Sequence, residues 1–175
     1  MSLSRASDRI VKLTLAFFVT LLVTACMKPL YGPTASGSSI RSVLSSIDVK
    51  HIPDVAGHYL REELLFVFNG GSESDQSTPT YTLTVSLSES SQAVALDSTG
   101  GRADAASLTI SAKYTLTDLK GKKLNEGVAS ASASIDRLSQ RFAAVRAVRD
   151  ARIRVSKTLA EQIEAQLAAY FSSNN

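Results

Sequence analysis

The chain has 175 residues, a formal net charge of +3 and a single cysteine, Cys26. Two of the three excess positive charges lie in residues 1–25, and the 150 residues after them carry 16 basic and 15 acidic side chains. The high isoelectric point is therefore no sign of nucleic-acid binding, and one cysteine excludes an intramolecular disulfide. The length after residue 25 suits one ordinary domain with its own core.

The first 25 residues have the pattern of a lipoprotein signal peptide. Arg5, Arg9 and Lys12 precede thirteen uncharged residues at 13–25, which end in small side chains directly before Cys26. A spanning helix needs about 20 apolar residues, so this run is too short to cross the bilayer. We expect cleavage before Cys26 and a covalent N-acyl and S-diacylglycerol lipid on that residue. The alternative is an uncleaved membrane anchor with a buried cysteine.

A lipidated Cys26 fixes the location of the protein. Several acyl chains together hold a protein on a bilayer stably, whereas one chain binds only weakly. Met27, rather than an aspartate, comes after the cysteine, which permits transfer to the outer membrane. We therefore expect the protein on the periplasmic side of the outer membrane, with no cofactor other than the lipid.

Residues 26–45 are rich in Pro, Gly and Ser and predict a flexible tether, which leaves residues 46–175 as the folded domain. A short strand is predicted at 47–49. Pro53 and Asp54 end it and begin a helix. The apolar stripe of this helix is Leu60, Leu64, Val67 and Phe68, and the helix is expected to end at Asn69-Gly70-Gly71.

From Thr80 onward, apolar and hydroxyl side chains alternate, which predicts three consecutive strands. The inward residues of the first two are Tyr81, Leu83, Val85, Leu87, Leu108, Ile110, Ala112, Tyr114 and Leu116. A tight turn around Gly121 leads to the third strand, whose inward residues are Gly127, Ala129, Ala131, Ala133 and Ile135. Because these side chains are small, something large must lie close over this strand.

The last predicted helix, residues 142–171, is long enough at about 1.5 Å per residue to cross the sheet. Its apolar side, expected to cover the sheet, holds Val145, Val148, Val155, Leu159, Ile163, Leu167 and Tyr170. The order βαβββα predicts an α+β fold, a four-stranded mixed β-sheet with two helices packed on one face. A right-handed crossover makes the first two strands parallel if they are neighbours.

Three stretches carry a resemblance to a known family. They are CMKPLYG at residues 26–32, IPD at 52–54 together with LREEL at 60–64, and the terminal helix from FA at 142–143 through DAR at 150–152 to LAAYF at 167–171. Their order and spacing resemble the lipopolysaccharide-assembly lipoprotein family LptE over essentially the whole chain after residue 25. Met27 and Lys28 stand where many relatives have Gly-Phe.

The resemblance implies an outer-membrane lipoprotein that sits as a plug inside the large β-barrel of LptD and helps assemble it. This complex is the translocon that delivers lipopolysaccharide to the outer leaflet. The implied partners are the LptD barrel, lipopolysaccharide and the outer membrane itself, and no catalysis is implied.

The outward positions of the three strands have one chemical character that suits such a role. Twelve of thirteen are Ser or Thr, and Lys113 is the only charge. Hydroxyl groups pair with varied partners at a lower desolvation cost than ions, which favours a contact surface. An ordinary solvated sheet face remains the alternative, because Thr has a good strand propensity.

Five basic residues are candidate contacts for lipopolysaccharide phosphate, because guanidinium and ammonium groups bind phosphate. They are Arg102 in a Gly-rich loop, Lys120, Lys122 and Lys123 in the turn, and Arg152 in the last helix. Arg152 falls on the apolar side of its helix, so it must reach solvent, pair with an acid or contact a ligand. For all five, a solvated surface is the alternative.

Catalytic and metal sites are not predicted. His51 and His58 have no cysteine and no clustered carboxylates beside them in sequence that could complete a metal site. The sequence also contains no nucleophile elbow and no phosphate-binding loop. The competing function is a free-standing, lipid-anchored periplasmic module that binds a small amphiphile between helices and sheet. A structural lipoprotein without a ligand is a third class.

Overall fold

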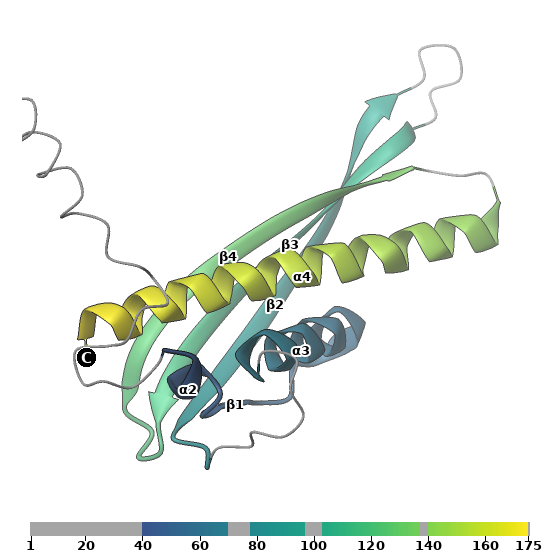
Figure 1. The fold of residues 1–175 in the computed structure, drawn as a ribbon. Coiled ribbons are helices and arrows are strands. Elements are labelled where there is room, and N and C mark those ends of the chain that lie inside the picture. The colour runs from purple at the N-terminus through teal and green to yellow at the C-terminus, as the bar shows by residue number, and fades with distance from the viewer. Residues whose placement is uncertain (1–39, 70–77, 97–102, 137–139, 175) are drawn as a thin grey trace, which may run out of the picture. The chain divides into compact units, whose positions relative to one another are not determined.

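The computed structural model describes residues 40–69, 78–96, 103–136 and 140–174, all within the unit formed by residues 33–175 (Figure 1). The predicted signal peptide, Cys26, residues 27–39 of the predicted tether and Arg102 lie outside these ranges. The fold of the domain is thus defined by four stretches of the chain.

Three helices and four strands make up this part of the chain. In chain order they are α2 (Ile40–Leu44), β1 (Ile47–Val49), α3 (Asp54–Asn69), β2 (Tyr81–Leu96), β3 (Ala103–Asp118), β4 (Lys123–Asp136) and α4 (Arg141–Asn174). The strands form one sheet in the order β1-β2-β3-β4. β1 is parallel to β2, and the other two pairs are antiparallel, so the predicted mixed α+β sheet is confirmed.

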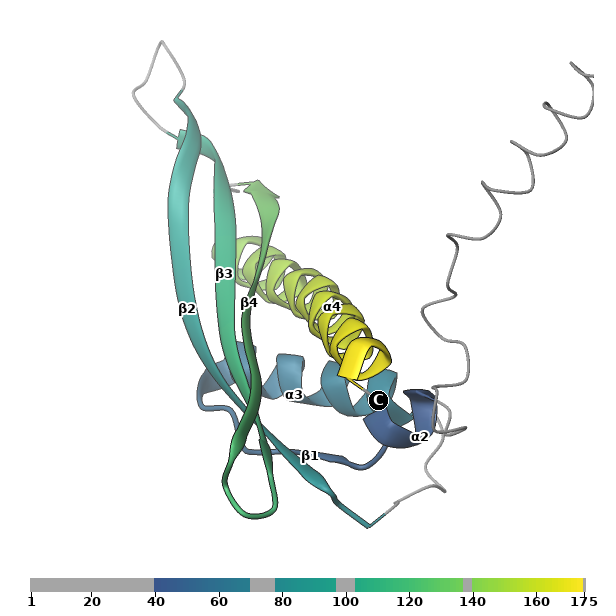
Figure 2. The ribbon, with the colours of Figure 1, turned by 90° about the vertical axis from the view of Figure 1, so that its left-hand side faces the viewer.

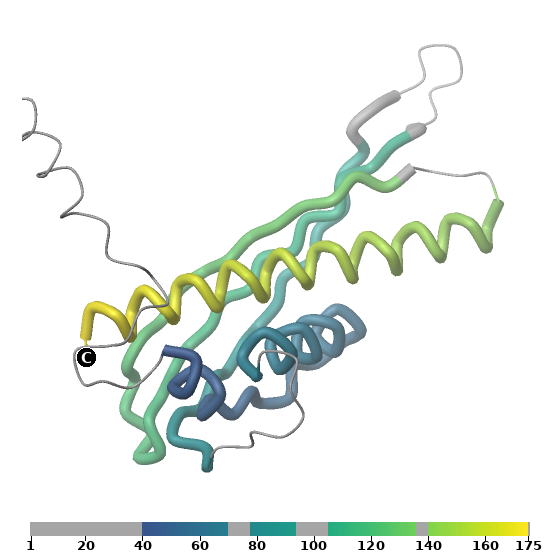
Figure 3. The backbone as a smooth tube through the Cα atoms, in the orientation of Figure 1, coloured from purple at the N-terminus to yellow at the C-terminus, as the bar shows by residue number. Residues whose placement is uncertain are grey.

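The two long helices pack on one face of the sheet, as predicted. Figure 2 shows α3 and α4 on the same side of β2, β3 and β4, and Figure 3 shows the backbone of α4 running along β4. The core between these layers is closed by fully buried side chains. The largest are Tyr114, Phe68, Ile40, Ile52, Leu60, Leu64, Leu83, Leu108, Ile110, Leu116, Leu159 and Ile163.

Helix α2 is the first departure from the sequence prediction. Ile40 and Leu44 are 1% and 2% exposed and belong to the core, in contact with α3 and α4. The packed domain therefore begins by Ile40, earlier than the boundary at residue 46 that we predicted. Two apolar residues four apart in a five-residue helix give too short a pattern to distinguish from a loop.

The first turns of α4 are the second departure. Val145 was predicted on the side that covers the sheet, yet it is 64% exposed, and Phe142 is 86% exposed. Burial along α4 starts at Ala151 and continues to Phe171. A helical wheel identifies which side chains share a side, but it does not reveal whether a partner lies beside each turn.

A close contact between strand and helix explains the small residues of β4. Tyr114 on β3 pairs in register with Gly127 on β4, is 2% exposed, and donates a hydrogen bond from its Oη to Oε1 of Gln166 on α4 at 2.8 Å. A Cβ atom at position 127 would lie only 2.6 Å from that Oη. Burial raises the pKa of the Tyr114 hydroxyl, so it remains a neutral donor at physiological pH. The prediction of a large group over the small strand is confirmed.

Gly127→Ala is expected to destabilise the domain by about 1–3 kcal/mol, because the added methyl group enters the space of the Tyr114 side chain. Chemical denaturation of the purified protein measures the change. In a Tyr114→Ala background the same substitution should cost clearly less, since the two nearest atoms are then gone and only Oε1 of Gln166, the end of a flexible side chain at 2.8 Å, remains close. An equal cost in both backgrounds would contradict this account of the strand.

Candidate functional site

The sheet face opposite the helices is a continuous hydroxyl surface, defined by the outward Ser and Thr residues of β2, β3 and β4. The register aligns them in rows across three strands, for example Ser88 with Ser111 and Ser130. The Oγ atoms of Ser111 and Ser130 lie 3.1 Å apart. No described helix covers this face (Figure 2). Lys113 and Glu126 are exposed charges here, and both lie toward the β3–β4 turn.

The β4 edge of the sheet is covered by side chains of α4. Gln162 Oε1 accepts a hydrogen bond from the backbone N–H of Ser130 at 3.2 Å, and Gln166 Nε2 donates to the carbonyl of Val128 at 3.3 Å. These bonds occupy backbone groups that an added strand would need. At these two positions an added strand would have to displace the side chains of Gln162 and Gln166.

Arg152 is bound by an acid, one of the three outcomes that its position on the apolar side of α4 allowed. Its Nη2 lies 2.7 Å from Oε1 of Glu89 on β2, and its Nε donates to the same carboxylate at 3.1 and 3.2 Å. The hydrogen bond to Glu89 raises the pKa of Arg152, so the guanidinium stays charged. Glu89 was missed by the sequence analysis, although it continues the inward alternation of β2. Contact of Arg152 with lipopolysaccharide stays a prediction.

The lysine turn has the geometry of a tight hairpin tip, as predicted. One side-chain oxygen of Asp118 accepts hydrogen bonds from the backbone N–H groups of Lys120 and Lys122, both at 2.9 Å. Gly121 has a φ of 79°, a conformation that suits glycine. Lys123 pairs with Glu126 at 3.1 Å, and Lys120 and Lys122 are exposed.

The structure does not bring the candidate phosphate contacts together. Arg152 lies beside Glu89, which pairs in register with Ile110, whereas the lysine turn comes after Asp118. Ile110 and Asp118 are eight positions apart along β3, which corresponds to roughly 26 Å. No single phosphate group can therefore contact Arg152 and the lysine turn at once. The placement of Arg102 is outside the described residues.

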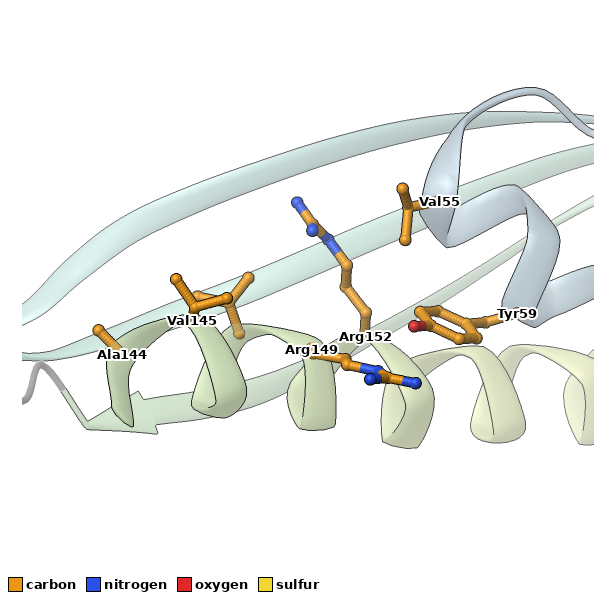
Figure 4. Close-up of a pocket in the computed structure, with 7 residues that line it drawn as sticks. Val55, Tyr59, Ala144, Val145, Arg149 and Arg152 are labelled. Carbon is orange, nitrogen blue, oxygen red and sulfur yellow. The ribbon is translucent and has the colours of Figure 1, made fainter. Parts of the chain in front are cut away.

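An apolar groove of about 410 Å³ lies between α3 and α4. Its lining residues are Val55, Tyr59, Ala144, Val145, Val148, Arg149 and Arg152. Figure 4 shows Arg152 pointing toward the strands and Arg149 extending in the direction of Tyr59. The sequence analysis missed this groove, because it is formed by two helices that are far apart in the chain.

The described residues offer neither a metal centre nor a membrane-spanning helix. No three His, Cys, Asp or Glu side chains in these ranges gather as metal ligands. Among the same residues, no helix combines the length and the hydropathy of a membrane span.

The domain is similar in fold to solved structures of bacterial proteins. A crystal structure of a lipoprotein from Caulobacter crescentus CB15 is 24% identical, with a TM-score of 0.63 over 77% of this chain and 97% of that one. A minor lipoprotein from Acinetobacter baumannii is 18% identical, with a TM-score of 0.56 over 70% and 90%. An uncharacterized lipoprotein B from Nitrosomonas europaea is 15% identical, with a TM-score of 0.52 over 73% and 84%. At these identities the likeness shows the fold alone.

A family model described as "LptE: Lipopolysaccharide-assembly" matches residues 44–167. The match begins at the end of α2 and runs into the last turns of α4, which is well over half of the chain. Comparison with curated protein sequences gave no match.

The Arg152–Glu89 pair should couple by about 0.5–1 kcal/mol, because both side chains are about one-third exposed and are screened by solvent. A double-mutant cycle with Arg152→Ala and Glu89→Ala measures this coupling in denaturation experiments. The coupling should shrink as salt rises from about 0.05 M to about 0.5 M, since mobile ions screen partly exposed charges. A coupling of zero at low salt would show that the pair contributes nothing to stability.

Proposed function

The chain belongs to the lipopolysaccharide-assembly family LptE, and we propose that it is an outer-membrane lipoprotein that plugs and helps assemble the LptD β-barrel. The resemblance noted in the sequence is confirmed by the family match. The family works in lipopolysaccharide assembly. The barrel partner, the plug geometry and the direct contact with lipopolysaccharide belong to the proposal, as does the absence of catalysis.

The hydroxyl surface is the observation that carries the plug proposal. The lumen of an outer-membrane barrel is polar, so a plug has to present polar groups without burying unpaired ions. Ser and Thr hydroxyl groups donate and accept, which lets them pair with either kind of lumen group. On β2, β3 and β4 these hydroxyl groups form aligned rows that no described helix covers (Figure 2).

The lipid anchor at Cys26 is the second part of the proposal. In it, the acyl chains on Cys26 insert into the periplasmic leaflet of the outer membrane. Fourteen residues along the chain lead from Cys26 to Ile40, the first described residue of the packed domain. At full extension they span at most about 50 Å, which sets the maximum distance between the bilayer surface and the domain.

A free-standing lipid-anchored module that binds a small amphiphile is the second candidate. The apolar groove between α3 and α4, with arginines in its lining, favours this function. The two candidates differ in partnership. A plug extracted in mild detergent elutes together with a barrel, whereas a lone module elutes as a monomer.

Three aspartates on the hydroxyl surface, at Thr84, Thr115 and Ser132, should weaken copurification of LptD several-fold. Each substitution places a charge where the proposal buries a hydroxyl group, and an unpaired buried charge is costly. Affinity purification of the lipidated protein from membranes, with quantification of the barrel in the eluate, measures the effect.

The matched control adds the same three charges on α4, as Thr158→Asp, Ser173→Asp and Asn174→Asp. These positions are exposed and lie away from the hydroxyl surface. Copurification should stay near the wild-type level in this control. If the hydroxyl-surface variant copurifies the barrel at the wild-type level, the hydroxyl surface does not form the proposed barrel contact.

The mature protein should begin at Cys26 and carry three acyl chains. Intact-mass analysis of the protein purified from membranes measures this directly, and Cys26→Ala should abolish the lipid mass. An unmodified thiol, or a chain that retains residues 1–25, would refute the lipoprotein assignment.

A further inference from the structure

The groove between α3 and α4 exposes apolar side chains that a folded domain usually covers. Val55 and Val145 line it and are 57% and 64% exposed, and Phe142, one turn before Val145, is 86% exposed. A concave, mostly apolar lining with a few polar or charged groups is the usual character of a ligand site. The groove therefore fits an apolar ligand segment.

The two charged side chains that line this groove are both arginines, Arg149 and Arg152. Arg152 is held by Glu89 and Arg154 by Asp150, at 2.7 and 3.1 Å. Arg149 lines the groove, and it has no ion pair within the described residues. Its guanidinium is therefore available to an anionic ligand, and a phosphate matches its donor geometry.

The apolar lining of the groove matches the apolar part of an anionic amphiphile, and the available guanidinium of Arg149 matches its anionic part. We propose that the α3–α4 groove holds one acyl chain of a phosphorylated lipid, with a phosphate bound at Arg149. This inference rests on the proposed function for the identity of the lipid, which is then lipopolysaccharide. Arg152, oriented by Glu89, forms the side of the groove that faces the strands (Figure 4).

A photo-crosslinking residue at Val145 tests the proposal in the full chain. The variant Val145→p-benzoylphenylalanine is expressed in cells, irradiated, and purified under denaturing conditions. The expected result is an adduct detected as lipopolysaccharide by antibody and by mass. Val145 is exposed, so the probe replaces no core side chain.

Val128→p-benzoylphenylalanine is the matched control, because Val128 is a similarly exposed valine, at 60%, on the hydroxyl surface of β4. The control should give no lipid adduct, and under the proposed function it should give an adduct with the LptD barrel. A barrel adduct at position 128 without a lipid adduct at 145 overturns the groove proposal and leaves the proposed function standing. A lipid adduct at 145 without a barrel adduct at 128, and without barrel copurification, supports the groove proposal and overturns the proposed plug function.

The identity of the Val145 adduct decides the remaining cases. An adduct with a protein, or with phospholipid only, overturns the assignment of the groove to lipopolysaccharide.

A second experiment tests the charge of Arg149. Arg149→Glu in the Val145 probe variant should lower the lipopolysaccharide adduct about three- to fivefold. Lys157→Glu, a matching charge reversal at an exposed position of α4 outside the groove lining, should leave the adduct unchanged. Equal adduct in both variants would overturn the role of Arg149.

Discussion

The packing of α4 on β4 is the constraint on which the rest of the described domain depends. It is possible because β4 turns the small residues Gly127, Ala129, Ala131 and Ala133 toward the helix. As a result, α4 lies close enough for Gln162 and Gln166 to bond the β4 backbone. The same approach buries the Tyr114 ring between sheet and helix, over Gly127. A larger residue on this strand would push the helix away and would break both sets of contacts.

The close approach of α4 also determines which surfaces remain available. Because α3 and α4 both lie on one face of the sheet, no described helix covers the hydroxyl groups of the other face (Figure 2). Burial along α4 begins only at Ala151, and so its first turns stand beside α3 with apolar side chains exposed. The hydroxyl surface and the groove are thus two consequences of one helix position.

The strands and the main helices could be predicted from the sequence, because their periodicity is long and regular. Helix α2 could not, since its five residues make little more than one helical turn, too short a pattern to recognise. The exposure of Val145 and the pairing of Arg152 with Glu89 depend on which turns of α4 meet which strand residues. The groove depends on two helices that are separate in the chain. Local sequence patterns do not reveal contacts between elements that are distant in the chain. The alternation of side chains within one strand is local, and so it could be predicted.

The opposite placement of the two surfaces bears on how one small domain serves a large assembly. A barrel wall that contacts the hydroxyl surface leaves the helical face free, because the sheet separates the two. A lipid in the groove therefore does not compete with the barrel for the same side chains. The lysine turn and Arg152 do not act as one phosphate site, because roughly 26 Å of strand separates them. In this arrangement the position of the groove selects one arginine, Arg149, for the phosphate.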